Sequence, residues 1–479
     1  MIAMTLAEIA SAVSGRLHLA GASSTATSVV DGATETDSRE IAPGGIFVAK
    51  RGEHTDGHLF APVAVERGAA LLIVERPLDL DVPQVLVDDS VEALGALATE
   101  VVRRARALGG LTVIGVTGSN GKTTTKNLLR TILERVGETV APRGSFNNEV
   151  GAPITMLQVS ETTRFLVAEM GASAVGEIRR LVRMAKPDVG IVLAVGLAHA
   201  GEFGGIERTL EAKTEMVADL TADDVAVLNA DDGRVASMQT RTAAPVLWFG
   251  RGERADVRAV DVESSADGTR FTIEVSAGRG LAGREREAAS AELFLRVLGE
   301  HHVMNALAAT AAALSVGVPL EDVVAALSTV TLAERWRMQV LGGDEVTVVN
   351  DAYNASPDST AAALRTLAQI NRPGGRTVAV LGEMSELGEW ADEEHDRIGL
   401  LAVRLNIAQI VVVGAGARRI HVAAEREGSW SGESVFAESA DDAYEFLEGY
   451  LQSGDTVLVK SSNSAGLRFL GDRLGERHR

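Results

Sequence analysis

The stretch Leu111-Thr112-Val113-Ile114-Gly115-Val116-Thr117-Gly118-Ser119-Asn120-Gly121-Lys122-Thr123-Thr124-Thr125 decides the expected fold. Its first half is apolar and β-branched and predicts a buried strand, and residues 122–136 favour a helix. The glycines of the loop between them let backbone N–H groups approach a phosphate at the N-terminus of that helix. Lys122 can reach β and γ phosphates, and Thr123 can bind Mg²⁺. The stretch predicts a phosphate loop. Because Val116 stands where the strict pattern has its first glycine, an ordinary Gly-rich turn is the alternative.

The residues that follow this loop alternate between apolar runs and helix-forming segments. Such alternation predicts a parallel sheet with crossover helices. Residues 256–297 instead alternate apolar and polar side chains at period two around turn residues, which predicts an antiparallel addition to the same sheet. The expected strands lie at 165–168, 189–194 and 225–229, and the expected helices at 174–184 and 206–220.

The two ends of the chain predict further α/β units. The first hundred residues mix short β-rich runs, turns and a helical pattern at 60–68, and a helix at 304–316 leads to a boundary near Val340. Beyond it, apolar runs separated by helices predict a second doubly wound sheet, with strands at 346–350, 377–381, 409–413 and 456–460. At about 150 residues per domain, 479 residues favour three domains. We expect a smaller N-terminal α/β domain (1–108), a central mostly parallel domain of the P-loop type (109–340) and a Rossmann-like C-terminal domain (341–479).

The composition excludes several classes of function. The chain has 66 Asp and Glu against 46 Lys and Arg, and its net charge of −20 argues against nucleic acid and anionic membranes as partners. Without cysteine there is no disulfide, thiolate metal ligand or cysteine nucleophile. The longest apolar run is too short to insert into a membrane and the N-terminus lacks a signal-peptide pattern, so we expect a cytoplasmic protein.

Lysine is rare in this chain. Six of the 46 basic residues are lysines, which leaves 40 arginines. A lysine can lose its proton and be modified under conditions in which an arginine stays charged. We therefore expect lysine to be kept where the chemistry requires it. The six are Lys50, Lys122, Lys126, Lys186, Lys213 and Lys460.

The loop at 116–124 resembles the nucleotide loop of the Mur ligases, ATP-dependent enzymes that form amide bonds in peptidoglycan synthesis. Further stretches carry the same resemblance over nearly the whole chain, and their combination is specific. They are Thr-Asp-Ser-Arg at 36–39, Asp-Gly-His at 56–58, Phe-Asn-Asn-Glu-Val-Gly-Ala-Pro at 146–153, Glu-Met-Gly-Ala at 169–172, Asn-Asp-Ala-Tyr-Asn-Ala-Ser-Pro at 350–357 and Leu-Gly-Glu-Met-Ser-Glu-Leu-Gly at 381–388.

The resemblance is strongest to the family member that joins D-alanyl-D-alanine to UDP-N-acetylmuramoyl-tripeptide. It implies an acyl-phosphate intermediate, ATP and Mg²⁺ as cofactors, and a monomer that serves cell-wall synthesis, cell shape and division. The N-terminal domain would bind the UDP substrate, and the C-terminal domain would close over ATP and the dipeptide. The alternatives are another Mur-type or folylpolyglutamate-type amide ligase, and a nucleotide-operated binding switch that forms no bond.

The resemblance also assigns the catalytic groups, which are Lys122, Glu169, His199 and Lys213. Thr123 and Glu169 would hold a first magnesium, and His199 and Lys213 a second. Lys213 would be carbamylated by CO₂, which turns a cation into an oxygen-donor anion, and an always-protonated arginine cannot do this. Taken alone, Glu169 and Lys213 would be interpreted as solvated side chains, and His199 as a hydrogen-bonding surface residue.

The expected nucleotide contacts extend beyond the loop. Asn305 has an amide suited to an adenine edge, although it could equally cap a helix. Arg337 matches an arginine that approaches the ATP phosphates, with Arg335 as a weaker rival. Asp351 and Tyr353 are expected at the ribose and base, or in a turn. The full predicted set is Thr117, Gly118, Ser119, Asn120, Gly121, Lys122, Thr123, Thr124, Asn305, Arg337, Asp351 and Tyr353.

The remaining substrate contacts rest on two short segments. Ser38 and Arg39 are expected at the UDP end, where Arg39 could pair with a diphosphate, and Asn147 and Asn148 at the sugar or peptide. The chain departs from the family pattern at His302, where asparagine is usual and no role is assigned. It departs again at 461 and 463, which hold Ser and Asn in place of the usual glycine and basic residue. Residues 414–416 lack the third glycine of a dinucleotide fingerprint, so NAD is not expected.

Overall fold

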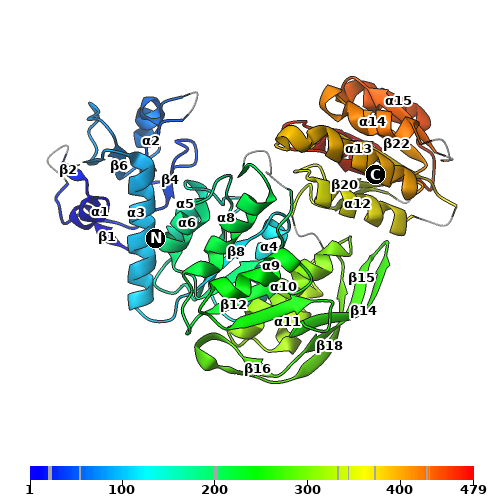
Figure 1. The fold of residues 1–479 in the computed structure, drawn as a ribbon. Helices are drawn as coiled ribbons and strands as arrows, with labels where there is room; N and C mark the ends of the chain where they lie inside the picture. Colours follow the sequence, from blue (N-terminus) through cyan, green and yellow to red (C-terminus); the bar gives the residue numbers. More distant parts are fainter. Residues whose placement is uncertain are drawn as a thin grey trace.

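The computed structural model describes residues 1–479 except 20–23, 53–54, 198–202, 332–333, 344, 372–373, 428–429 and 431. Three α/β units follow one another along the chain and across the molecule (Figure 1), from the blue N-terminal unit through the green central unit to the orange and red C-terminal unit. Each contains its own sheet. This agrees with the expected α/β fold class. Within the described residues, no helix is long and apolar enough to cross a membrane.

The N-terminal unit has a five-stranded sheet in the order β2-β7-β6-β5-β4. Only the β2–β7 pair is antiparallel. A 3-10 turn at Gly57–Phe60 precedes α2, so the helix expected at 60–68 is shorter. The strands are β2 Arg16–His18, β4 Thr34–Glu35, β5 Ile46–Val48, β6 Leu71–Val74 and β7 Gln84–Leu86, with β1 Met4–Thr5 paired to β3 Val29–Val30, and the helices are α1 Leu6–Ala12, α2 Ala61–Glu66 and α3 Ser90–Ala107.

The central unit is built on nine strands in the order β18-β15-β14-β13-β12-β11-β8-β10-β9. The strands from β9 to β14 run parallel, and β15 and β18 add the expected antiparallel edge. Its strands are β8 Thr112–Thr117, β9 Thr139–Val140, β10 Phe165–Glu169, β11 Val189–Val192, β12 Val225–Asn229, β13 Val246–Gly250, β14 Val257–Ser265, β15 Gly268–Val275 and β18 Ala289–Leu295, with a small β16 Gly278–Arg279 and β17 Glu285–Arg286 pair. Its helices are α4 Lys122–Leu133, α5 Gly151–Met156, α6 Glu177–Ala185, α8 Ile206–Ala218, α9 Gly233–Ser237, α10 His301–Ser315 and α11 Leu320–Leu327.

The C-terminal unit is a six-stranded sheet in the order β19-β20-β24-β21-β22-β23, parallel except for the β19 edge. Apolar clusters cover both of its faces. The strands are β19 Gln339–Gly342, β20 Thr347–Asn350, β21 Thr377–Leu381, β22 Gln409–Val413, β23 Glu433–Ala437 and β24 Thr456–Lys460, and the helices are α12 Pro357–Gln369, α13 Ala391–Arg404, α14 Arg418–Glu425, α15 Ala440–Tyr450 and α16 Arg468–Arg477.

The predicted elements differ from the observed ones mainly at their ends. The helix expected at 174–184 begins only at Glu177, because Gly176 stands before it with a left-handed φ of 101°. The strand expected at 189–194 ends at Val192, although the Leu193 N–H still bonds the Thr117 carbonyl at 3.0 Å as the chain turns over the loop. The strand expected at 165–168 extends by one residue and so includes Glu169. The sequence pattern thus located these three elements, but it did not predict the residues at which they begin or end.

Helix α3 joins the N-terminal unit to the central one through a shared apolar core. Its buried face packs against α5 and α6 as well as against α1 and β6 of its own unit. One continuous cluster of buried residues runs from Ile2 through Leu97 to Trp248. Arg106, near the end of α3, also forms a bidentate ion pair with Asp188, which lies just before β11. Its Nη1 and Nη2 atoms each lie 2.9 Å from a carboxylate oxygen of Asp188. The N-terminal and central units are therefore joined by apolar contact, whereas the apolar clusters of the C-terminal unit include only Leu298 and Met338 from the residues before 341 that the structure describes.

Replacing Leu97 by alanine should destabilise this joint core. Leu97 is fully buried in α3, and its loss leaves a cavity that costs about 2–5 kcal/mol of unfolding free energy. Urea unfolding followed by circular dichroism measures the change. Leu108→Ala is the matched control, because Leu108 caps the same helix and is 59% exposed, so its midpoint should hardly move. Equal midpoints for the two variants would contradict the shared core.

Candidate active site

The loop between β8 and α4 has the backbone shape that its glycines predict. Gly118 has a φ of 152°, and a Cβ added there would lie 2.8 Å from the Cβ of Leu193. Gly121 begins α4 with a left-handed φ of 83°, and a Cβ there would collide with Oδ1 of Asn305. Strand β8 lies between β10 and β11, where the connections change sides of the sheet. Open α/β sheets bind ligands at such a point, at the carboxyl ends of the strands.

Lys122 places its ammonium group over this loop. Nζ donates to the carbonyl of Gly118 at 2.6 Å. Desolvation lowers the pKa of Lys122, and the positive charge of Arg337 acts in the same direction, while Glu169 opposes both. A polyanionic ligand in the loop would raise the pKa of Lys122 again, because negative charge next to the amine stabilises its protonated form.

A group of oxygen ligands lies beside Lys122. The Thr123 hydroxyl donates to Oε1 of Glu169 at 3.2 Å and lies 2.9 Å from Oγ of Ser145, and Asn147 Nδ2 donates to the same Oε1 at 2.8 Å. The second carboxylate oxygen of Glu169, Oε2, is buried and has no partner within the described residues. An anionic oxygen left without a partner at 1% exposure fits a hard cation such as Mg²⁺. Among the described residues, no three His, Asp or Glu side chains gather as a metal site.

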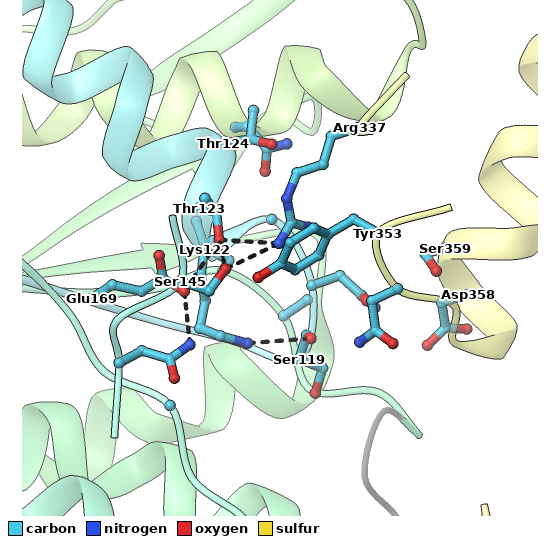
Figure 2. A pocket seen from close by; sticks show the side chains of 18 of the residues that line it. Ser119, Lys122, Thr123, Thr124, Ser145, Glu169, Arg337, Tyr353, Asp358 and Ser359 are labelled. Carbon is cyan, nitrogen blue, oxygen red and sulfur yellow. Dashed lines mark hydrogen bonds between the residues drawn. The ribbon is translucent and has the colours of Figure 1, made fainter. Parts of the chain in front are cut away.

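Side chains of the C-terminal unit and of the segment before it reach the same loop (Figure 2). Arg337 Nη2 donates to the hydroxyls of Thr123 and Ser145, both at 3.2 Å, and its guanidinium lies 4.3 Å from the centre of the Tyr353 ring. Ser356, the N-cap of α12, donates to Oδ1 of Asn120 at 3.0 Å. The phosphate loop thus lies at the junction between the central and C-terminal units, and side chains from both units contact it.

Arg335, the weaker candidate, points elsewhere. It pairs with Asp472 of α16 at 2.9 Å and lies over the Trp336 ring. Asp351 makes a 2.7 Å ion pair with Lys460 and accepts the Met338 N–H, and both side chains line the cavity. Lys460 also donates to the Asn354 carbonyl at 2.7 Å. These bonds hold the ends of β20 and β24 against the junction.

One cavity of about 710 Å³ collects most of the predicted nucleotide residues. The predicted residues among its lining are Ser119, Asn120, Gly121, Lys122, Thr123, Thr124, Asn147, Asn148, Glu169, Asn305, Arg337, Asp351 and Tyr353. Thr117 and Gly118 lie just beneath it, since the Thr117 hydroxyl bonds the Met170 carbonyl and Gly118 accepts from Lys122. Residues separated by more than 200 positions therefore meet around one space.

Two predicted substrate-binding residues, Ser38 and Arg39, do not line this cavity. Ser38 is buried within the N-terminal unit, and Arg39 is exposed, where it forms a bidentate pair with Asp37 and holds the pKa of that carboxyl at about 2. His199 falls at 198–202, outside the described residues. Nothing in the described structure therefore joins Ser38 or Arg39 to the nucleotide loop, and the prediction for His199 is not tested.

Lys213 lies on α8 at 2% exposure, and its Nζ lies 5.3 Å from the centre of the Phe203 ring. Lys213 does not line the cavity. Its pKa nevertheless depends on the charge of Lys122, which does. Desolvation first, and then the charge of Lys122, lower the pKa of Lys213 to about 7, although Glu177 and Glu215 oppose the shift. A large share of these amines is therefore uncharged near neutral pH. An uncharged amine is a nucleophile, which the expected reaction with CO₂ requires.

Comparison with known proteins identifies the family. Residues 33–113 match the model of the Mur ligase family catalytic domain, 116–313 the Mur ligase middle domain and 336–463 the Mur ligase glutamate ligase domain. The chain belongs to the Mur ligase family. This confirms the resemblance first seen in the loop sequence. All three models together extend over most of this Mur ligase.

Individual relatives are similar over the whole length. The UDP-N-acetylmuramoyl-tripeptide–D-alanyl-D-alanine ligase of Mycobacterium tuberculosis H37Rv is 43% identical, covering 99% of this chain and 98% of its own. MurF of Acinetobacter baumannii matches with a TM-score of 0.87 at 31% identity over 99% of both chains. MurF of Thermotoga maritima, solved in complex with ADP, matches with a TM-score of 0.78 at 28% identity over 93% of this chain and 99% of its own.

Several residues of this Mur ligase site were missed by sequence reasoning. Ser145 lies just before the Phe146 motif, and Ser356 and Asp358 lie at the start of α12, so their roles depend on how distant elements pack. For Lys126 there was one indication of a special role in the sequence, which is the rarity of lysine in this chain. It is fully buried, and Nζ donates to the carbonyls of Pro142 at 2.8 Å and Gly144 at 3.2 Å, which positions the Ser145 segment.

Replacing Lys213 by methionine should stabilise the ligand-free Mur ligase in CO₂-free buffer. Between pH 7 and about 10.5 the unfolded chain holds the Lys213 proton and the folded chain does not, so this lysine makes the unfolding free energy rise with pH. The advantage of Lys213→Met should be largest near pH 7 and shrink by roughly 1.4 kcal/mol per pH unit above it. Urea unfolding at pH 7, 8 and 9 measures it, with the exposed Lys186→Met as control. A pH-independent difference for Lys213→Met would show that its amine is solvated.

Proposed function

We propose that this chain joins D-alanyl-D-alanine to UDP-N-acetylmuramoyl-tripeptide with cleavage of ATP to ADP and phosphate, giving the pentapeptide precursor of peptidoglycan. The observation that carries this proposal is the single cavity in which the phosphate loop of one unit faces Arg337 and Tyr353 across the junction. The similarity to ligases of this name over the whole chain supports the same substrates.

The reaction has two steps. The terminal carboxylate of the tripeptide attacks the γ-phosphorus of ATP, the bond to the β-bridging oxygen breaks, and ADP leaves behind an acyl phosphate. The uncharged amine of the dipeptide then attacks the acyl carbon, and phosphate leaves as the amine gives up a proton. Lys122, the loop N–H groups and Arg337 would hold the phosphoryl oxygens, where charge gathers in both steps. Mg²⁺, held by Thr123 and Glu169, would supply further positive charge to those oxygens.

The three units would divide the substrates between them. Residues 1–108 would bind the UDP end through Ser38 and Arg39, which requires Arg39 to exchange its Asp37 partner for a diphosphate. Residues 109–340 would bind ATP, with Asn147 and Asn148 facing the sugar or peptide. Residues 341–479 would cover ATP and the dipeptide. The protein would work as a monomer in the cytoplasm, where its nucleotide substrates are made.

Lys213 and His199 would complete the site as ligands of a second magnesium. The neutral Lys213 amine attacks the carbon of CO₂, a nitrogen–carbon bond forms, and loss of one N–H proton leaves a carbamate anion. The lowered pKa of Lys213 favours the first part of this reaction, and the nearby Lys122 charge favours the anionic product. A buried cation thereby becomes an oxygen ligand.

Phosphate release measured with the substrates added singly and together tests the proposed reaction. We expect release from ATP only when both UDP-N-acetylmuramoyl-tripeptide and D-alanyl-D-alanine are present, with the pentapeptide seen by mass spectrometry. Lys122→Ala should lose at least about 100-fold in rate because it removes a phosphate-binding cation, while its thermal unfolding stays cooperative.

Release that is indifferent to the dipeptide would contradict the ligase and favour a nucleotide-operated switch. Lys50→Ala is the matched lysine control for Lys122→Ala, since Lys50 does not line the nucleotide cavity. Its phosphate release at saturating UDP substrate should stay near that of the parent chain.

Carbamylation of Lys213 can be detected directly. In ¹³C-bicarbonate, the parent protein should show a carbamate carbon signal that is absent in Lys213→Ala and Lys213→Arg. Both variants should lose activity, and added acetate or propionate should restore part of it in Lys213→Ala, where the space can admit a small carboxylate. An active Lys213→Arg enzyme would contradict the metal-ligand role, because arginine stays a cation.

A further inference from the structure

The lining of the cavity includes both charged and apolar side chains. Lys122, Glu169 and Arg337 are among the charged ones. Leu193, Phe249 and Met304 are apolar, and His302 and Asn305 of α10 add polar groups, with Asn305 lying against Gly121 of the phosphate loop. Apolar side chains with a few fixed polar groups among them suit a heteroaromatic ring better than a phosphate. This part of the lining therefore suits the base of a bound nucleotide.

The His302 ring is held in one orientation by its neighbours. Thr125 donates from its hydroxyl to Oδ1 of Asn305 at 3.4 Å, and Nδ2 of Asn305 lies 3.1 Å from Nδ1 of His302. With the amide oriented in this way, Nδ1 accepts, so a neutral ring carries its proton on Nε2. The His301 ring packs against it with 4.1 Å between centroids. The direction of the free ring nitrogen is therefore fixed before any ligand binds.

His302 lines the cavity and is only 3% exposed, and its buried Nε2 atom lacks a hydrogen-bond partner within the described residues. Burial, His301, Arg337 and Lys460 all lower the pKa of His302 well below its ordinary value. The ring is therefore neutral at neutral pH. A buried N–H donor without a partner is costly to maintain, and it points to a ligand that accepts its hydrogen bond.

We propose that His302 determines base specificity by donating its Nε2–H to an unprotonated ring nitrogen of a purine. The inference rests on the proposed function, because the purine is that of ATP. It assigns a role to a position at which this chain departs from the family pattern. Asn305 then acts on the base and also positions His302, and the Thr125 hydroxyl on α4 couples both to the phosphate loop.

Two isosteric variants separate the ring nitrogens. In His302→Gln the side-chain amide nitrogen can occupy the place of Nε2, whereas in His302→Asn the amide replaces Nδ1 and nothing reaches the Nε2 position. Dipeptide-dependent phosphate release is measured with ATP and with 1-deaza-, 3-deaza- and 7-deaza-ATP, each of which replaces one ring nitrogen by C–H. The readout is the ratio of kcat/KM for ATP to that for each analogue.

The parent chain should discriminate against one deaza analogue by on the order of 10-fold, the effect of one neutral hydrogen bond. His302→Gln should keep most of this ratio, and His302→Asn should bring it close to one. His421→Phe is the control, because His421 bonds Ser434 in the C-terminal unit away from the cavity, and its ratios should equal those of the parent. Nitrogen-15 NMR of the ligand-free protein should show His302 protonated on Nε2.

Failure of the inference and failure of the proposed function give different results. An active parent chain whose analogue ratios match those of His302→Asn overturns the base contact alone. A proton found on Nδ1 overturns the donor assignment. A parent chain that releases no phosphate from ATP in the presence of both substrates overturns the proposed function, whatever the analogues do.

Discussion

The site depends on lysine amines that are held out of water. Lys122, Lys126 and Lys213 all have their pKa values lowered, with desolvation as the largest cause. Glu169 opposes this shift for the first two, and Glu334 also opposes it for Lys126. Carbonyl oxygens of Gly118, Pro142 and Gly144 compensate part of the cost. Bound phosphates would supply the missing negative charge. A chain of net charge −20 can thus bind polyanions, because the attraction is local and desolvated while the repulsion is distant and screened.

The two junctions between the units are made of different interactions. Helix α3 joins the N-terminal and central units through a continuous apolar core. These two units cannot separate without exposing that apolar surface to water. The C-terminal unit meets the loop through polar contacts such as Ser356 to Asn120 and Arg337 to Thr123. Polar contacts can be exchanged for water at small net cost. Movement that admits or releases nucleotide is therefore expected at the second junction.

Local pattern predicted local structure well. The strand at 225–229, three strands of the C-terminal sheet and the phosphate loop follow from short apolar runs and from glycine positions, and they were predicted nearly to the residue. Ser145, Ser356 and the orientation of His302 could not be predicted, because each depends on elements far apart in sequence. The functions of Ser38, Lys213 and the other site residues, like the edges of the domains, stay predictions. Lys213 illustrates why, since its chemistry depends on burial, which spacing does not reveal.

The apolar face of α3 also matters while the chain is being made on the ribosome. The helix ends at Ala107, just before the expected edge of the first domain, but the α5 and α6 surfaces that cover it are complete only when residue 185 has emerged. The N-terminal unit therefore spends part of its synthesis with uncovered hydrophobic surface, during which a chaperone can bind it. An expected domain edge in the sequence is here not the edge of a unit that completes its folding alone.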